Sequence, residues 1–577
     1  MNFSEIIKEN TLLGIKLANK DVVNIKFLSN ISINQIKPIL EYDLRSLDLN
    51  AIVSIGDYDN IIQESNFIPS DNIVIIFWEL SNLINSFYYE IEIADHDKFN
   101  LYLNKVKNEL QLVFENLKNI KLVLFNKFSH LAFTSRSLKV GNFEKLVNTL
   151  NSYLEDILPK NFVLVDIDKP LSNTSIELAI DLRSFYSNKT LYSTSFIKNY
   201  VNFILPVITS VFGKSKKAII FDCDNTLWKG IVGEDGIDGI CLSENDKNGI
   251  FFREIHLLAK YFAMNGIIVG LCSKNNDKDV KEVFESRKDF VIFDSDITIK
   301  KVNWNDKATN LTEISKELNI GTDSIVFIDD SEFEINLIKE RIPEIYSILV
   351  PSKLFEYPKL INEIKDIFYS KSLSKEDKDR LNMYKQNQER QESSNSFNNI
   401  DDYLRSLDIK IQIDFKPMGS IDRLVQLTQK TNQFNLTTKR YSISEMMYFL
   451  NAENCFVYSF DVSDKFGNSG LTGLCLVKKE NEVAVIDTLL MSCRVLGRNI
   501  EKVFMYEVLM DLKEKGIKMI TGEYRKTPKN AQVENYFENN YFKLESSSDE
   551  IKKYSFDYLS DEINNTINYI SVSWNKN

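Results

Sequence analysis

The sequence is poor in the residues that build disulfide frameworks and histidine-rich metal sites. Its 577 residues include 6 Cys and 3 His. No two cysteines form a CxxC pair, and the histidines, at positions 96, 130 and 256, lie far apart along the chain. A structural zinc site needs clustered Cys and His ligands, and a small secreted scaffold needs denser cysteine. We therefore expect neither disulfide bonds nor structural zinc.

The sequence also lacks a long uncharged apolar run. Stretches such as Phe203 to Phe212 are among the longest, about half of the roughly 20 residues that a membrane-spanning helix requires. The first residues, MNFSEIIKENTLLGIKLANK, mix charged and apolar side chains and contain no signal-peptide core or small-residue cleavage site. We expect a cytoplasmic protein that does not act at a membrane.

An excess of basic residues is missing as well. The chain carries 70 Lys and Arg against 82 Asp and Glu, a net charge of -12 at pH 7. Nucleic-acid-binding proteins present basic patches or stripes, so we expect no nucleic-acid partner. With 44% hydrophobic residues, the chain can bury several cores, and its length favours two to four domains.

The order of apolar runs predicts an α/β protein of three domains. Residues 1–214 alternate short β-rich runs, such as AIVSIGDYDN and NIVIIFWEL, with helical segments, a pattern typical of a mostly parallel sheet. Residues 215–369 repeat this architecture, through AIIF, IIVGLC and SIVFIDD. Residues 370–399 are polar and read as an exposed helix or linker. Residues 400–577 mix helices and strands in an α+β pattern.

Two aspartates in the segment FDCDNTLW are the most informative residues. Asp222 and Asp224 lie at the carboxyl end of a predicted strand, where open α/β sheets place their sites. Side chains at i and i+2 of an extended segment point to the same side. One carboxylate can attack phosphorus while the other gives a proton to the leaving group.

Three later strand ends supply what such a reaction also requires. Ser273 offers a hydroxyl to a phosphate oxygen, and Lys307 offers a fixed positive charge. Asp329 and Asp330 offer oxygen ligands for Mg. Each signal is weak alone, but the four motifs in this order at strand ends predict a phosphoryl-transfer site.

These motifs resemble those of the haloacid dehalogenase (HAD) superfamily. The resemblance implies that Asp222 is the nucleophile of an aspartyl-phosphate and that Asp224 is the acid/base, which favours a phosphatase over a transport ATPase. It implies a Mg ion bound by Asp222, the Asp224 carbonyl and Asp330. Asp329 would then lie next to these metal ligands without binding the ion directly. The implied phosphate-binding residues are Thr226, Ser273 and Lys307.

The spacing of the motifs leaves no room for a sizeable cap domain. About fifty residues separate Asp222 from Ser273, and about twenty separate Lys307 from Asp329. We expect an open site, suited to a phosphate on a large or protein-bound partner or to a site covered by another domain of the chain.

The longer phrases DCDNTLWKGIVGEDG, WNDKATN and FIDDSEFE resemble the FkbH-like family of this superfamily. Its members join such a domain to an N-terminal SGNH-hydrolase-like domain and a C-terminal acetyltransferase-like domain. The resemblance implies a bifunctional glyceryltransferase/phosphatase. It would take the glyceryl group of 1,3-bisphosphoglycerate, remove its phosphates and pass the acyl group to the phosphopantetheine thiol of an acyl carrier protein.

In the first domain, LSN at Leu28 to Asn30 and IGDYDN resemble SGNH-hydrolase blocks and would make Ser29 a nucleophile. Such a serine needs a histidine base. The domain's last segments contain no His where that family has one, so we interpret the domain as a structural or docking module. Ser29 is then expected to cap the helix that begins near INQIKPILEYD.

In the third domain, MSCRVLGRNIE resembles the GNAT acyltransferase motif, which presents backbone N–H groups at a helix N-terminus to the CoA pyrophosphate. Asn499 stands where that pattern has a small residue, so a phosphopantetheine arm is the alternative ligand to acetyl-CoA. The predicted pantetheine-binding residues are Arg494, Gly497, Arg498 and Asn530, and Tyr536 is a further candidate near the thiol.

Two cysteines are candidates for carrying the acyl group. Strand alternation turns Cys223 away from the two aspartates, and their charge would oppose thiolate formation. Cys493 precedes Arg494 near a helix N-terminus, a setting that lowers a thiol pKa. We favour Cys493, with the alternatives that it is a small buried hydrophobe or that the acyl group passes directly to the carrier protein.

Two other interpretations stay open. One is a capless phosphatase that acts on another phosphorylated metabolite, with the flanking domains as scaffold. The other is a non-enzymatic assembly platform, against which the intact motif residues argue. The sequence does not determine the carrier protein, the final product or the oligomeric state.

Overall fold

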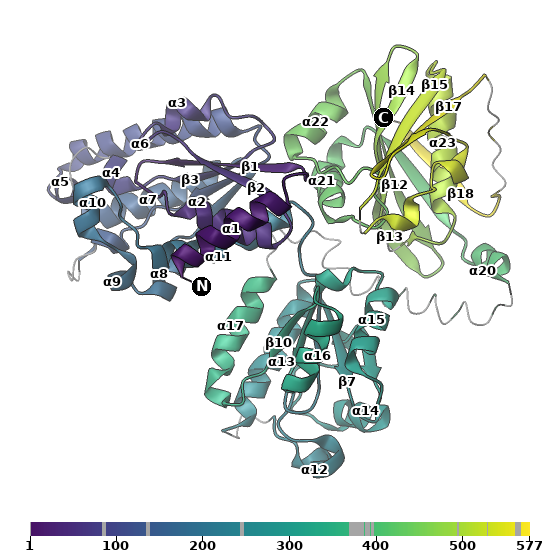
Figure 1. Cartoon of the computed structure of the whole chain (residues 1–577), viewed down its shortest axis with the longest axis horizontal. Helices are drawn as coiled ribbons and strands as arrows, with labels where there is room; N and C mark the ends of the chain where they lie inside the picture. Colours follow the sequence, from purple (N-terminus) through teal and green to yellow (C-terminus); the bar gives the residue numbers. More distant parts are fainter. Residues whose placement is uncertain are drawn as a thin grey trace. The chain divides into compact units, whose positions relative to one another are not determined.

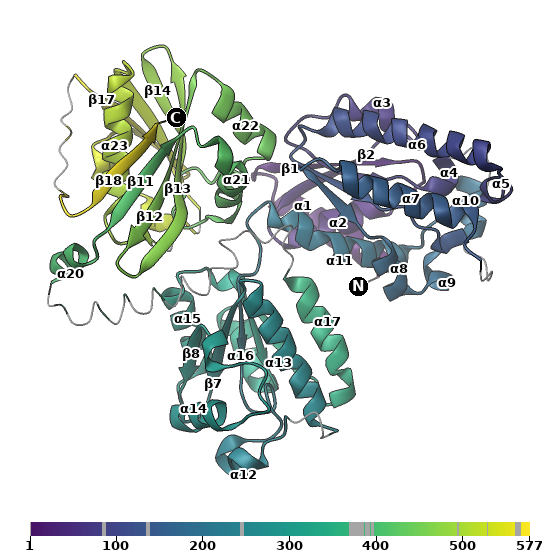
Figure 2. The ribbon, with the colours of Figure 1, turned by 180° about the vertical axis from the view of Figure 1, so that it is seen from behind.

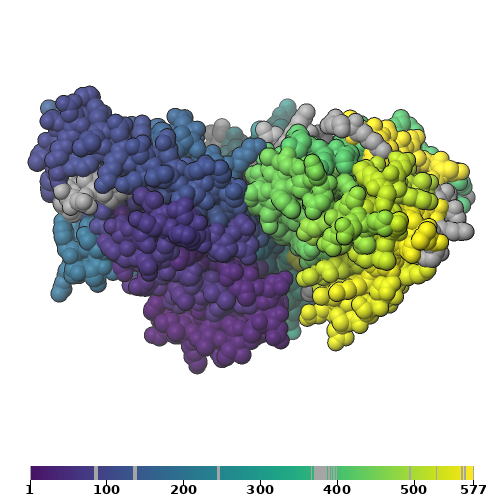
Figure 3. Space-filling model, turned by 90° about the horizontal axis from the view of Figure 1, so that it is seen from above, coloured from purple at the N-terminus to yellow at the C-terminus, as the bar shows by residue number. Residues whose placement is uncertain are grey.

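The computed structural model describes residues 2–83, 88–133, 139–242, 247–368, 399–492, 495–527, 529–559 and 567–576, and the single positions 386, 390, 393, 397 and 563. Figure 3 draws these residues in sequence colours and the others in grey. The chain divides into two compact units. The first comprises Met1–Thr209 and Tyr441–Met447, and the second comprises Ser210–Arg440 and Tyr448–Asn577.

The first unit contains a five-stranded parallel sheet in the order β2-β1-β3-β4-β5. This is the flavodoxin-like order of doubly wound folds. The apolar runs of the sequence supply the buried strands, as predicted. Their bounds are β1 Val22–Ser29, β2 Asn50–Ile55, β3 Ile73–Phe77, β4 Leu122–Asn126 and β5 Phe162–Val165.

Helices cover both faces of this sheet. The connection from β1 to β2 and the connection from β2 to β3 run in opposite directions along the sheet, and Figure 1 shows α2 on one side of the strands and α3 and α6 on the other. The helices are α1 Phe3–Lys16, α2 Ile36–Ser46, α3 Ile61–Ser65, α4 Leu80–Leu83, α5 Tyr88–Glu92, α6 His96–Leu117, α7 Asn142–Ile157, α8 Asp168–Thr174, α9 Ile176–Ala179, α10 Leu182–Asn188 and α11 Thr194–Ser210.

The second unit begins with another five-stranded parallel sheet, in the order β10-β9-β6-β7-β8. The prediction that this region repeats an α/β architecture is confirmed. Its central strand, β6, leads directly into the two motif aspartates. The strands are β6 Ala218–Phe221, β7 Ile268–Ser273, β8 Ile299–Val302, β9 Ile325–Asp329 and β10 Tyr346–Leu349.

Two apolar cores hold helices against the two faces of this sheet. One contains side chains of α13 and α17, and the other contains side chains of α15 and α16. Within the described ranges, one short helix and one long helix, α12 and α13, connect β6 to β7. The helices are α12 Val232–Gly239, α13 Gly249–Met264, α14 Asp277–Ser286, α15 Lys307–Glu317, α16 Glu332–Arg341 and α17 Tyr357–Ile367.

The C-terminal region forms an eight-stranded mixed sheet in the order β16-β17-β15-β14-β13-β12-β11-β18. Only the β14–β15 and β11–β18 pairs are parallel among the pairings of this sheet. Figure 2 shows β18 beside β11 at one edge. The strands are β11 Lys410–Phe415, β12 Cys455–Asp464, β13 Gly467–Glu480, β14 Val483–Met491, β15 Met519–Arg525, β16 Lys543–Ser547, β17 Ile551–Asp557 and β18 Ser571–Lys576.

One apolar core joins this sheet to α23, whose side chains Val503, Phe504 and Val508 are fully buried in it. The predicted mixture of helices and strands in this region is therefore confirmed. The helices are α20 Ile400–Ser406, α21 Ile421–Lys430, α22 Ile443–Asn451 and α23 Ile500–Glu514. Across the described part of the chain, the helices are too short or too polar to cross a membrane.

The predicted linker at 370–399 lies almost entirely outside the described residues, but Arg390 departs from the expected exposure. Its buried guanidinium donates to both carboxylate oxygens of Asp464 at 2.8 Å. Arg498 donates to the same carboxylate at 3.0 Å, and the backbone N–H groups of Phe466 and Gly467 also bond to it. One buried carboxylate thus neutralises part of the charge of two guanidinium groups.

This cluster predicts that Asp464→Ala strongly destabilises the C-terminal sheet. Removing the carboxylate takes from two buried guanidinium groups the charged partner that they share, a loss of about 3–5 kcal/mol. Hydrogen exchange at the amides of β12 and β13, read by mass spectrometry, measures this loss. Glu482→Ala is the control, because the Lys518–Glu482 pair is more than half exposed and such pairs contribute about 1 kcal/mol or less. Equal effects of the two substitutions would contradict the prediction.

Candidate functional site

The motif residues predicted to act on phosphate gather at the carboxyl edge of the second parallel sheet. Asp222 directly follows β6, and its backbone N–H donates to Ile328 of the neighbouring strand β9 at 2.9 Å. β9 ends at Asp329 and β7 ends at Ser273. Parallel strands end at the same edge of a sheet, so separate sequence segments meet there.

Lys307, the first residue of α15, lies between two of these carboxylates. Its Nζ is 2.9 Å from Asp222 Oδ1 and 2.7 Å from Asp329 Oδ2. All three side chains are buried. The N-cap of α15 is Asp306, whose side chain accepts the backbone N–H of Thr309, so the helix start that carries Lys307 is fixed.

The buried charges alter one another's protonation. Burial raises the pKa of Asp222 to about 7, because desolvation outweighs the attraction of Lys307 and the charge of Asp329 adds to it. Burial alone would lower the pKa of Lys307, but the two aspartates raise it above its ordinary value. The pKa of Asp330 is raised by burial and by Asp329. The lysine therefore stays charged, and the surrounding carboxylates favour a further positive charge.

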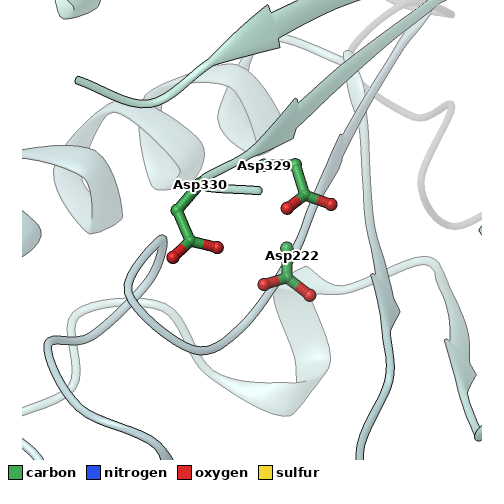
Figure 4. A group of neighbouring side chains, drawn as sticks. All are labelled: Asp222, Asp329 and Asp330. Atoms are coloured by element: carbon green, nitrogen blue, oxygen red, sulfur yellow. The ribbon is translucent and has the colours of Figure 1, made fainter. Parts of the chain in front are cut away.

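Three carboxyl groups at this edge fit a divalent cation. Asp222, Asp329 and Asp330 each offer an oxygen, and these atoms lie within 4.8 Å of one another. Figure 4 shows Asp329 and Asp330 at the end of one strand and Asp222 at the end of the next. Carboxylate oxygens are preferred ligands of Mg²⁺, which suits the predicted cofactor.

Asp224 lies outside this group and is held by three donors. Its Oδ1 accepts the indole N–H of Trp228 at 2.8 Å and the backbone N–H of Val232 at 3.1 Å. Its Oδ2 accepts the side-chain amide of Asn275 at 2.9 Å. Sequence reasoning assigned no role to Trp228 or Asn275, although both stand within a few residues of a motif.

The two predicted phosphate-binding hydroxyls also lie at this edge. Ser273 is buried and its Oγ accepts a second N–H of Asn275 at 3.3 Å. Thr226 is buried, and its Oγ1 has no hydrogen-bond partner within the described residues. An unpaired buried hydroxyl is costly, so a phosphate oxygen at Thr226 would relieve a deficit.

The two candidate thiols differ in what can be described. Cys223 is fully buried in the apolar core of this domain, and burial and the adjacent Asp222 raise the pKa of its thiol. This agrees with the expectation that the neighbouring charge opposes thiolate formation, although the thiol also interacts with Ser273. Cys493 and Arg494 lie outside the described residues.

The start of α23 carries the described part of the predicted pantetheine site. Gly497 has a φ of 77°, and a Cβ there would meet no atom within 4 Å. Asn499 is the N-cap with a φ of 61°, and its amide donates to Tyr569 instead of capping the helix. Arg498 is buried against Asp464, and burial lowers its pKa to about 10. Backbone N–H groups, more than Arg498, are thus available for an anion at this helix end.

The gap beside β14 is filled by the chain itself. β14 and β15 pair only from Val483 to Ile486 and from Met519 to Gly522. Farther along, the backbone of Leu436 accepts from Arg525 at 2.8 Å and donates to Leu489 at 3.1 Å, which joins the two strands through a third segment. A pantetheine arm therefore cannot lie between these strands while residues 434–436 occupy the gap.

The side chain of Asn530 hydrogen-bonds to the segment 434–436 and to the end of β15. Its amide N–H groups donate to the carbonyls of Asn435 and Arg525, each at 2.9 Å. Its oxygen accepts from Thr527 at 2.8 Å and from Tyr524 at 3.1 Å. These four bonds use the full capacity of an asparagine side chain, so a contact with pantetheine requires one of them to break. Tyr536, the other candidate here, is buried and donates to the Glu501 carbonyl at 2.8 Å.

Ser29 is the last residue of β1, and the prediction that it caps a helix is wrong. The helix α2 begins at Ile36, with Gln35 as its N-cap. The Ser29 hydroxyl lies 2.9 Å from the Ile31 carbonyl and 3.1 Å from the Phe77 carbonyl. Its described partners are backbone groups, with no imidazole among them.

Comparisons with known proteins bear on the fold of this chain. No family model and no curated protein matches the sequence. The crystal structure of the N-terminal part of BF1531 from Bacteroides fragilis, containing a phosphatase domain complexed with Mg, matches with a TM-score of 0.57 at 23% identity. It covers 64% of this chain and 100% of that chain. A likeness at this identity establishes a shared fold.

Two acetyltransferase structures give weaker matches. The PaiA N-acetyltransferase from Thermoplasma acidophilum in complex with coenzyme A has a TM-score of 0.17 at 17% identity and covers 20% of this chain and 69% of that chain. The ribosomal-protein-S18-alanine N-acetyltransferase from Escherichia coli has a TM-score of 0.21 at 10% identity and covers 27% of this chain and 99% of that one. Similarity this limited carries no argument about function.

The surroundings of Ser29 predict that Ser29→Ala leaves catalysis within a few-fold of the unmodified protein. Among the described residues the hydroxyl bonds only to backbone groups, so its loss removes a buried hydrogen bond, about 1 kcal/mol of stability, and no catalytic group. Turnover by the purified variant, compared with that of the unmodified protein, measures the effect. Loss of turnover in a folded Ser29→Ala protein would show that the first unit is catalytic.

Proposed function

We propose that this protein is a Mg²⁺-dependent phosphatase of the HAD type whose activity serves glyceryl transfer to an acyl carrier protein. The observation that carries the phosphatase proposal is the buried group in which Lys307 contacts Asp222 and Asp329 beside Asp330. This group combines a carboxylate in position to attack, a fixed cation and oxygen ligands for a metal.

In the proposed reaction, a carboxylate oxygen of Asp222 forms a bond to phosphorus while the bond from phosphorus to the leaving oxygen breaks. Asp224 gives its proton to that oxygen. Water then attacks the aspartyl-phosphate and passes a proton to Asp224, which releases phosphate and restores both side chains. Lys307, Ser273 and Thr226 bind the phosphate oxygens. A Mg²⁺ held by Asp222, Asp330 and the Asp224 carbonyl would supply charge neutralisation.

We propose 1,3-bisphosphoglycerate as the source of the glyceryl group. Its acyl phosphate is activated toward attack at carbon, for which a thiolate is a far better nucleophile than a hydroxyl at neutral pH. Its 3-phosphate is an unactivated monoester, suited to the Asp222 site. Two chemically different groups of one substrate thus need two different protein groups, and we assign the acyl group to the thiol of Cys493.

The flanking regions fit this proposal as an SGNH-like domain without catalytic function at residues 1–214 and a GNAT-like domain at 400–577. The phosphopantetheine thiol of the carrier protein would approach the start of α23 near Gly497, since residues 434–436 fill the gap between β14 and β15. We expect the reaction to occur in the cytoplasm, without a nucleic-acid or membrane partner.

A second candidate function is dephosphorylation of another metabolite, with the flanking domains as scaffold. This second function is favoured by the hydrogen bonds of Ser29 and Asn530, because the polar atoms of both side chains bond to the protein itself. Comparing phosphate release from 1,3-bisphosphoglycerate with and without carrier proteins, with every protein species weighed by mass spectrometry, separates the two functions.

The proposed nucleophile predicts that Asp222→Asn removes most phosphate release while the fold persists. An amide oxygen is a poor nucleophile, so turnover should fall at least a hundredfold, and EDTA should abolish turnover of the unmodified protein. Malachite-green detection of phosphate measures both effects.

Glu285→Gln is the matched control, because it makes the same carboxylate-to-amide change at a side chain of the same domain that is 66% exposed. It should leave turnover unchanged. Near-normal phosphate release by Asp222→Asn, or full activity in EDTA, would rule out the proposed site.

The proposed acyl carrier predicts a glyceryl thioester on Cys493. Glyceryl-loaded protein should accumulate from 1,3-bisphosphoglycerate when carrier protein is omitted, and hydroxylamine should remove the added mass because it cleaves thioesters. Cys493→Ala should abolish loading and transfer but still remove the 3-phosphate from a supplied phosphoglyceryl thioester. Loading by Cys493→Ala but not by Cys223→Ala would place the thiol in the phosphatase domain. Transfer to carrier protein by both variants, with no loaded species, would mean direct transfer.

A further inference from the structure

The carboxylate of Asp224 accepts three hydrogen bonds from its surroundings. Its Oδ1 accepts two hydrogen bonds, from the Trp228 indole at 2.8 Å and the Val232 backbone at 3.1 Å. Its Oδ2 accepts one, from Asn275 at 2.9 Å. A carboxylate offers about four lone-pair positions, two on each oxygen. Oδ1 is therefore filled, and Oδ2 keeps one position open.

The indole that binds Oδ1 is itself immobilised. Trp228 is 0% exposed, and its ring lies against Phe290 and, edge-on, against Phe284. Asp224 and Trp228 also form a backbone bridge within the motif loop. An indole N–H group fixed by packing against two aromatic rings holds its acceptor at a set orientation, as precise catalytic geometry requires.

Asn275 connects the same carboxylate to the phosphate-binding hydroxyl. Its side chain is 5% exposed, and its Nδ2 reaches Asp224 Oδ2 at 2.9 Å and Ser273 Oγ at 3.3 Å. One amide thus sets the distance between the acid and a hydroxyl assigned to the phosphate. Asp224 follows β6 and Ser273 ends β7, so the Asn275 amide links the ends of two strands across the site.

We propose that Trp228 and Asn275 are positioning residues that turn the open side of Asp224 Oδ2 toward the leaving-group oxygen. The proposal rests on the proposed phosphatase function and adds to it the two side chains that aim the acid. Oδ2 delivers its proton to the leaving oxygen as the bond from phosphorus to that oxygen breaks, and Oδ1 stays bound to Trp228 and Val232 throughout.

The experiment compares two phosphate monoesters that differ in their need for an acid. An alkyl phosphate such as glycerol 3-phosphate must receive a proton as its alkoxide leaves, whereas p-nitrophenyl phosphate releases a stable phenolate. Trp228→Phe removes the indole N–H and keeps an aromatic ring, and Asn275→Ala removes the amide. For each variant, kcat/KM is measured with both substrates, because this ratio reports the step in which the leaving group departs.

We expect each variant to lose about tenfold or more in kcat/KM with the alkyl phosphate and less than about threefold with p-nitrophenyl phosphate. General acid catalysis accelerates a reaction by about 10²–10⁴-fold. An Asp224 carboxyl group held in the wrong orientation therefore loses part of that acceleration. Asp224→Asn should show the same pattern with a larger loss. Retained turnover of p-nitrophenyl phosphate also shows that the variant is folded.

Trp304→Phe is the matched control. Trp304 is 69% exposed and its indole donates to Asn276 Oδ1 at 3.0 Å in the same domain, whereas the described donors to Asp224 do not include it. It should leave both substrates unaffected. Equal losses with both substrates in Trp228→Phe and Asn275→Ala, or no loss with either, would overturn the proposal. Absence of turnover by the unmodified protein with both esters would instead refute the phosphatase function on which it rests.

Discussion

The buried contact of Lys307 with Asp222 and Asp329 is the constraint on which the site depends. Two carboxylates removed from water repel each other, and an ammonium at 2.9 and 2.7 Å makes their burial tolerable. The contact requires β6, β9 and the start of α15 to meet at one edge, which the order β10-β9-β6-β7-β8 provides. The apolar cores on both faces of the sheet hold these elements together.

Much of this arrangement could be predicted from the sequence, because the motif residues directly follow apolar runs that form parallel strands. Asp222, Ser273 and Asp329 each stand at the end of such a run, so a shared edge follows from the fold class. The partners of Asp224 could not be predicted in this way. Trp228 returns to Asp224 through the path of the loop after β6, and Asn275 reaches it from another strand, and neither path leaves a periodic signal.

The C-terminal sheet also shows which contacts could not be predicted from the sequence. The strand, loop and helix around Gly497 agree with the sequence pattern, and α23 begins at Ile500 as the motif indicates. The pattern gave no sign that residues 434–436, far upstream, hydrogen-bond both β14 and Arg525. Backbone groups of diverging strands need partners when they are buried, and a segment of the same chain satisfies them here. A local motif can therefore predict a helix start without predicting whether the adjacent gap is open.

Two buried ionic clusters of this chain differ in a way that separates structure from function. At Asp464, one carboxylate receives bonds from Arg390, Arg498 and two backbone N–H groups, so its acceptor positions are used within the protein. At the carboxyl edge of the second sheet, Asp222 and Asp329 share the ammonium of Lys307, and the exposed Asp330 lies beside them. In the first cluster the carboxylate is already bonded to protein donors. The second carries excess negative charge, which a fold tolerates where a cation completes it, and for this reason the proposed chemistry belongs there.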